Sequence, residues 1–201
     1  PYVIYEHDHK YLKSRNPANY NNFIAPKSEI INVDFYQNAK KVFCQTGFHK
    51  NIIEKNLSID NLFNLSGNLW SIEGLELLRG FSRGEKLNKA SIMVSATPHK
   101  NTKGAIYFCE KNDIDYDLIE PAMPNKFFEN LSKNKYLVFF PQTPETLSRI
   151  VVEARMMNMS LKTNGLIGAT KEPWFETKGE KLIDYFLEKR TEILQAVENA
   201  F

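Results

Sequence analysis

The chain has 201 residues, of which 42% are hydrophobic and 25% are charged, and its formal net charge is +2. This composition excludes long disorder, and the near-neutral charge excludes a dominant nucleic-acid partner, because phosphate binding needs clustered Lys and Arg. No apolar run approaches the roughly 20 residues of a transmembrane helix. The two cysteines, Cys44 and Cys109, have no metal-binding spacing and favour a reducing compartment. We therefore expect a cytoplasmic protein, with peripheral membrane association as an alternative.

The first 80 residues begin with an apolar strand and continue through short helices. Pro1, rather than Met, precedes the strand-like run from Tyr2 to Tyr5, and natural chains seldom begin inside a core strand. We therefore expect residues 1–80 to be the end of an incomplete, acceptor-side N-terminal domain with a Rossmann-like fold. The pattern predicts strands at 2–5 and 42–44 and helices at 28–38, 46–55 and 72–78, two of which begin at the capping residues Ser28 and Thr46.

A flexible, charged segment at 81–87 predicts a linker. After it, strands and helices alternate, which is typical of a parallel sheet covered by helices. The apolar run 136–140 is typical of a central strand buried on both faces. The predicted strands are 92–94, 116–119, 136–140 and 161–163, and the predicted helices are 103–111, 125–133 and 145–158. We expect an α/β fold, with a C-terminal Rossmann domain at 88–179 and a long amphipathic helix at 180–201.

The most informative segment follows the strand at 136–140. A loop containing Pro141 and Pro144 leads to Glu145, where we expect a helix to begin. In parallel sheets, ligands bind where strands end and helices begin, and free backbone N–H groups there suit a diphosphate. Seven residues separate Glu145 from Glu153, or roughly 12 Å along a helix. The spacing predicts one carboxylate near a sugar and the other near a ribose.

This strand, proline and pair of glutamates resemble the E-x7-E signature of retaining glycosyltransferases with the GT-B fold. The resemblance implies that Glu153 binds the ribose of the donor nucleotide and that Glu145 lies close to the transferred sugar. The strand at 92–94 and the turn Asn101-Thr102-Lys103-Gly104 are similar to the first strand of the family's C-terminal domain and its Lys-Gly turn. The resemblance implies that Lys103 neutralises the diphosphate, with Lys100 beside it.

The resemblance extends to the end of the first strand. Tyr5-Glu6-His7-Asp8 is similar to the strand-end motif whose histidine faces the sugar in this family, which implies a catalytic His7. Two departures stand out. The family has Gly-aromatic-Gly after the first glutamate, where its backbone approaches phosphate, and this chain has Thr146, Leu147 and Ser148. The family also carries an arginine a few residues before the Lys-Gly turn, which this chain lacks.

The implied reaction transfers a hexose, with retention, from a nucleoside-diphosphate sugar to an acceptor hydroxyl on a glycan, lipid or protein. It implies no cofactor and no metal, because the lysines and the helix N-terminus stabilise the leaving diphosphate. The missing glycine pair and the missing N-terminal acceptor domain favour a second hypothesis, in which the chain is a non-catalytic nucleotide-sugar-binding or assembly module with the same fold.

Several residues have simpler interpretations. Glu145 and Glu153 are also typical of ordinary charges on a helix, and Lys103 of a surface lysine. His7 and His9 lie on one face of an extended segment, but without a third ligand they are weak evidence for a metal site. Asp113-Ile114-Asp115 matches a D-x-D motif but precedes a strand, at the edge opposite the expected ligand crevice. Trp70 and Trp174 suit either a core or a base-stacking surface, and the methionines at 156, 157 and 159 suit a core.

Overall fold

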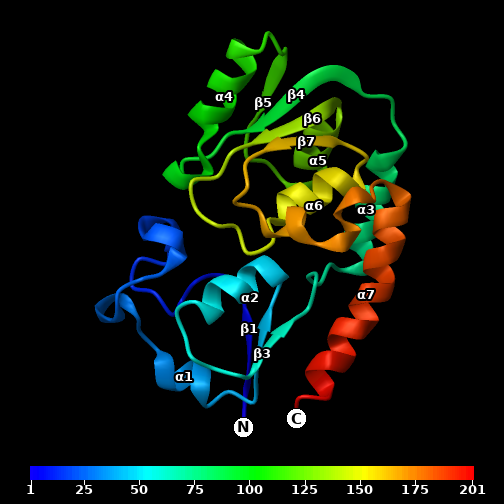
Figure 1. The fold of residues 1–201 in the computed structure, drawn as a ribbon. Helices are drawn as coiled ribbons and strands as arrows, with labels where there is room; N and C mark the ends of the chain where they lie inside the picture. Colours follow the sequence, from blue (N-terminus) through cyan, green and yellow to red (C-terminus); the bar gives the residue numbers. More distant parts are fainter.

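The computed structural model describes residues 1–201 as two halves, each built around a parallel sheet (Figure 1). The sheet of the first half has the strand order β1-β2-β3, and that of the second half has the order β5-β4-β6-β7. Every strand pair in both sheets is parallel. The predicted α/β fold with parallel sheets is therefore confirmed. The strands are β1 (Val3–Glu6), β2 (Lys41–Cys44), β3 (Leu62–Asn64), β4 (Leu87–Met93), β5 (Tyr116–Ile119), β6 (Asn134–Phe139) and β7 (Ser160–Thr163).

Helices connect the strands on both faces of the sheets. The helices are α1 (Val33–Gln37), α2 (Gly47–Glu54), α3 (Ile72–Ser82), α4 (Thr102–Lys111), α5 (Pro124–Ser132), α6 (Arg149–Met156) and α7 (Glu180–Glu198). Thr46 caps α2 as predicted, since its hydroxyl accepts a hydrogen bond of 3.1 Å from the His49 backbone N–H. The predicted helix at 28–38 is wrong for its first part. Helix α1 begins only at Val33, after Asn32 adopts a left-handed conformation with φ 59°.

The helix that carries the second glutamate also begins later than predicted. Helix α6 starts at Arg149, so Glu145 is not a helix N-terminal residue. The Glu145 backbone instead forms a parallel bridge with the segment after β7, because its N–H donates to Leu166 O and its carbonyl accepts from Gly168 N. These bonds hold Glu145 extended, and it does not share a helix with Glu153.

The segment expected to link the halves lies at the end of a helix. Residues 81 and 82 belong to α3, and β4 begins at Leu87. Helix α3 packs against α5 and α6, both in the second half, and against α7. We therefore propose that the boundary between the halves lies at residues 65–71, between β3 and α3, rather than at 81–87.

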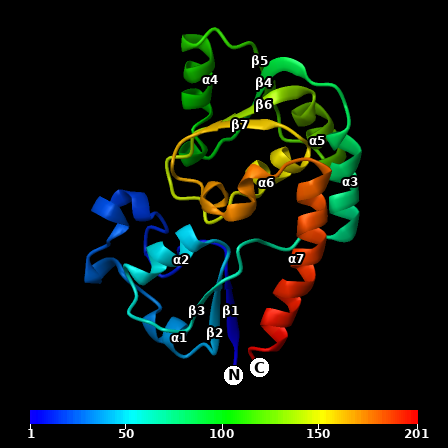
Figure 2. The ribbon, with the colours of Figure 1, turned by 45° about the vertical axis from the view of Figure 1, so that its right-hand side comes forward.

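Helix α7 packs against both halves and runs alongside them (Figures 1 and 2). Near its start, Leu182 and Phe186 are buried in the core of the second half. Two turns further on, Ile193 packs against Phe43 and Leu65 of the first half. A helix of 19 residues is about 28 Å long, enough to span two small domains. The helix therefore fixes how the two halves lie relative to each other.

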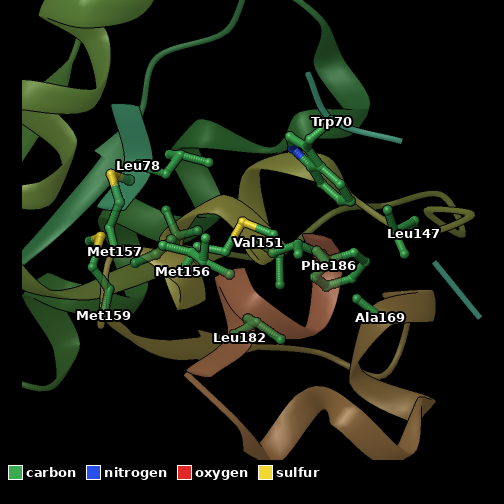
Figure 3. Close-up of a cluster of buried hydrophobic side chains, with 14 of the residues drawn as sticks. Trp70, Leu78, Leu147, Val151, Met156, Met157, Met159, Ala169, Leu182 and Phe186 are labelled. Carbon is green, nitrogen blue, oxygen red and sulfur yellow. The ribbon is translucent and has the colours of Figure 1, made fainter. Parts of the chain in front are cut away.

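The largest core fills the second half between α3, α6, α7 and the sheet (Figure 3). Met156, Met157 and Met159 are fully buried in it, which confirms their predicted role as core residues. Trp70 and Trp174 are also buried in this cluster, so both serve packing rather than base stacking at the surface. No helix of the structure combines the length and the apolar character that a bilayer crossing requires.

Candidate functional site

A polar cleft of about 530 Å³ lies between the two halves. It forms where β1, β4 and β6 end, which is the edge of parallel sheets at which ligands bind. Apart from Pro144, its lining side chains all carry polar or charged groups. The first half contributes His7, Asp8, Ser14, Arg15, Asn16 and Asn19, and the second half contributes His99, Lys100, Thr143, Pro144, Glu145 and Thr146.

Lys100 and Glu145 form an ion pair within the cleft. The Lys100 Nζ atom lies 2.8 Å from Glu145 Oε1, and the two side chains are 29% and 13% exposed. Lys100 ends a short 3-10 turn after β4, and a backbone bond of 2.8 Å from Gln142 N to His99 O ties this turn to the loop after β6. The pair therefore connects the two loops of the second half that line the cleft. It places a cation and an anion where a charged ligand would meet both.

His7 follows β1 and lines the same cleft as this pair. Its Nδ1 atom lies 3.0 Å from the Gln45 side-chain amide nitrogen, and its ring stacks on Tyr5 at 4.8 Å between centroids. Burial lowers the pKa of His7 below its ordinary value, and the positive charges of Lys10 and Arg149 lower it further. The imidazole is therefore neutral at physiological pH.

Hydrogen bonds between the halves close the floor of the cleft around Thr146. Its hydroxyl lies 2.7 Å from Gln45 Oε1 and 3.1 Å from His7 O, both in the first half. Its carbonyl accepts a bond of 2.6 Å from the Thr46 hydroxyl. A Cβ atom at Gly168 would collide with Thr146 O and Thr46 Oγ1. The contact therefore needs a glycine at this position.

Glu172 makes a second set of bonds between the halves. Its carboxylate accepts a bond of 2.7 Å from the Gly47 backbone N–H, and it also bonds the Ser66 hydroxyl. Sequence reasoning missed Gln45, Thr146 and Glu172 as site residues. Only the cap at Thr46 gave a signal near them, because contacts between segments a hundred residues apart leave no local pattern.

Glu153 lies in the core rather than in the cleft. It is 8% exposed, and its Oε1 atom accepts a bond of 3.0 Å from Trp70 Nε1. The Arg149 guanidinium lies 3.4 Å from the same oxygen and stacks over the Trp70 ring at 4.4 Å. Burial raises the pKa of Glu153, which the bonds from Trp70 and Arg149 offset in part. The carboxylate that the resemblance assigns to ribose thus has protein partners for one of its oxygens.

The remaining expected site residues lie elsewhere. Lys103 lines a separate hollow at the start of α4, together with Gln142. Leu147 is buried in the large core. Ser148 is buried just before α6 with φ 72°, and its hydroxyl has no hydrogen-bond partner. The structure thus gathers His7, Lys100 and Glu145 in the cleft and places Lys103, Glu153 and Leu147 outside it.

No three His, Cys, Asp or Glu side chains lie close enough together to bind a metal ion jointly. His9, which shares a strand face with His7 in the sequence, is buried against His49, with ring centroids 5.3 Å apart.

Neither the protein-family models nor the curated proteins yield a match to this sequence. Among solved structures, HepE from Anabaena, determined in complex with UDP and glucose, superposes on all of this chain with a TM-score of 0.53 at 12% identity. The chain has an α/β fold with parallel sheets that matches a fragment of the GT-B fold. It spans 64% of the HepE chain. A point mutant of TarM from S. aureus, in complex with Fondaparinux, alpha-GlcNAc-glycerol and UDP, aligns over 98% of this chain and 45% of its own, at 12% identity and a TM-score of 0.47.

Proposed function

We propose that this chain belongs to a retaining GT-B glycosyltransferase that transfers a hexose from a nucleoside-diphosphate sugar to an acceptor hydroxyl. The observation that carries the proposal is the cleft between the halves, where Lys100, Glu145 and His7 converge at the ends of parallel strands. Its volume is within the range of about 300–1,000 Å³ typical of small-molecule sites. The fold shared with HepE, which was determined with UDP and glucose, supports the same ligand class.

The cleft residues suit the charges of this reaction. As the sugar–phosphate bond breaks, negative charge grows on the diphosphate, and a cation placed beforehand stabilises it. Lys100, which lines the cleft, supplies that cation. Glu145 and His7 then contact the sugar, the first from the second half and the other from the first half. The halves must close around donor and acceptor so that the reacting atoms meet.

Calorimetric titration tests the donor site directly. UDP, GDP and ADP are titrated into the protein, and we expect one of them to bind and Lys100→Ala to weaken that binding about 10- to 100-fold, since a charged hydrogen bond contributes roughly 1.5–3 kcal/mol. The control is Lys181→Ala, which removes an exposed lysine outside the cleft and should leave affinity unchanged. If no nucleotide binds, or if both variants lose affinity equally, the proposed donor site is wrong.

One observation favours a second candidate, a non-catalytic nucleotide-sugar-binding or assembly module. Glu153, the residue implied to hold the ribose, bonds Trp70 instead. Incubation with UDP-glucose and other donor sugars separates the two candidates. Release of free sugar or transfer to an added acceptor supports the enzyme, whereas binding without turnover supports the module.

A further inference from the structure

The ring of His7 makes a hydrogen bond with a single side chain, that of Gln45. Gln45 follows β2 and is 4% exposed, so its amide has few orientations open to it. One end of the amide lies 3.0 Å from His7 Nδ1, and the other end lies 2.7 Å from the Thr146 hydroxyl. No protein group bonds the second ring nitrogen of His7, whose side chain lines the cleft. The orientation of the Gln45 amide therefore decides whether the second ring nitrogen of His7 donates a hydrogen bond to the ligand or accepts one from it.

The Thr146 hydroxyl favours one orientation of the amide. Its hydroxyl donates to Gln45 Oε1, the nearer of its two acceptors. The amide nitrogen, which only donates, then faces His7 Nδ1. A ring nitrogen that accepts a hydrogen bond carries no proton, so the single proton of the neutral ring lies on Nε2.

We propose that Gln45 and Thr146 are positioning residues that hold His7 as the Nε2–H tautomer, so that it donates a hydrogen bond to an oxygen of the bound ligand. Only the identity of that oxygen, a hydroxyl of the donor sugar, rests on the proposed function. The tautomer itself is a property of the free protein. The geometry makes His7 a donor in the resting state and not a base.

This arrangement also links His7 to the packing of the two halves. Gln45 and His7 belong to the first half, whereas Thr146 belongs to the second. The Thr146 backbone is tied to the first half by the bond from Thr46, so its hydroxyl stays in place only while the halves are in contact. Opening of the cleft would free the Gln45 amide and leave both tautomers of His7 accessible. The donor state of His7 therefore depends on the closed arrangement.

The test is nitrogen NMR of the histidine side chains in the ligand-free protein labelled with 15N-histidine. The chain has four histidines, and His7→Asn assigns the His7 signals by their loss. Long-range proton–nitrogen correlation at neutral pH distinguishes the two tautomers. We expect a protonated Nε2 and a bare Nδ1 in the wild type. A protonated Nδ1 would show that the amide has the opposite orientation and would overturn the proposal.

Variants separate positioning from mere folding. Gln45→Glu replaces the donor by an acceptor, so His7 should gain a proton on Nδ1, whereas the control Gln195→Glu on the exposed face of α7 should change nothing. Thr146→Val should give a mixture of both tautomers, and Thr146→Ser, which keeps the hydroxyl, should restore the wild-type signal. An unchanged His7 signal in Thr146→Val and in a folded Gln45→Glu would refute the assignment.

The result is independent of the donor-site test. If the Nε2–H tautomer is found and no nucleotide binds, the positioning holds and the proposed function fails. If a nucleotide binds and the tautomer is Nδ1–H, the proposed donor site holds and the positioning of His7 by Gln45 and Thr146 is refuted.

Discussion

Lys100 and Glu145 form the closer of two ion pairs within the cleft, 2.8 Å between Nζ and Oε1, and this pair opposes the binding of an anion. A diphosphate that approaches Lys100 must compete with a carboxylate already bonded to it and is repelled by that charge. The same carboxylate is well placed to bond a sugar hydroxyl. The pair therefore predicts opposite effects of Glu145 on nucleotide binding and on sugar transfer.

Glu145→Gln should raise the affinity for UDP while lowering turnover of a sugar donor. Loss of one nearby negative charge should tighten UDP binding roughly three- to tenfold, or about 0.7–1.4 kcal/mol. Calorimetry with UDP and a donor-hydrolysis assay measure the two effects. Glu198→Gln, an exposed glutamate near the end of α7, is the matched control. Weaker UDP binding in Glu145→Gln would mean that the carboxylate supports the nucleotide rather than opposing it.

Glu153→Ala should destabilise the fold. The simpler interpretation of the sequence made Glu153 an ordinary charge on a helix, but the structure buries this carboxylate against Trp70. Removal of the acceptor leaves Trp70 Nε1 buried without a partner, which should cost about 1–3 kcal/mol in the free energy of unfolding. Urea denaturation measures the change. Glu153→Gln keeps an acceptor oxygen, so its free energy of unfolding should fall less than that of Glu153→Ala. Equal decreases in the two variants would contradict the role of the hydrogen bond.

The raised pKa of Glu153 predicts a pH dependence of stability. Because the folded protein binds this proton more tightly than the unfolded chain, the contribution is fully present below the ordinary glutamate pKa of 4.5 and is lost as the pH rises through the raised folded value. The free energy of unfolding of the wild type, relative to that of Glu153→Gln, should therefore fall as the pH rises across this window. Urea denaturation at a series of pH values tests this. A relative stability that rises with pH would show that Arg149 and Trp70 outweigh burial.

Gly168→Ala should weaken the contact between the halves, whereas Gly80→Ala should stabilise the protein against unfolding. The added methyl group at 168 meets Thr146 O and Thr46 Oγ1, and overpacking of this kind typically costs about 1–3 kcal/mol. Nothing lies within 4 Å of the same methyl group at 80, inside α3, where alanine should stabilise the helix by about 0.5–1 kcal/mol. Thermal unfolding of both variants compares them. An unchanged melting temperature in Gly168→Ala would show that the contact between the halves accommodates the methyl group without loss of stability.

The sequence alone predicted the α/β class, the parallel second sheet and most of its elements. Alternating apolar strands and amphipathic helices repeat a short local pattern, so strands such as 136–140 and the cap at Thr46 could be identified directly. The start of α6 could not, because the residues after Pro144 favour a helix locally. The backbone bonds of Glu145 to Leu166 and Gly168 override that preference, and they come from a segment about twenty residues away.

The candidate site, like the fold, could be predicted only in part from the sequence. The resemblance to GT-B glycosyltransferases proposed His7, Lys100 and Glu145 as site residues, and each of them follows a strand, where parallel strands end at one edge of a sheet. Only the tertiary structure decided that Glu153 bonds Trp70 and that Gln45, Thr146 and Glu172 join the halves. The physical reason is distance along the chain: a hydrogen bond between residues 83 to 125 positions apart depends on how the sheets and α7 pack, and that packing leaves no periodicity in the sequence.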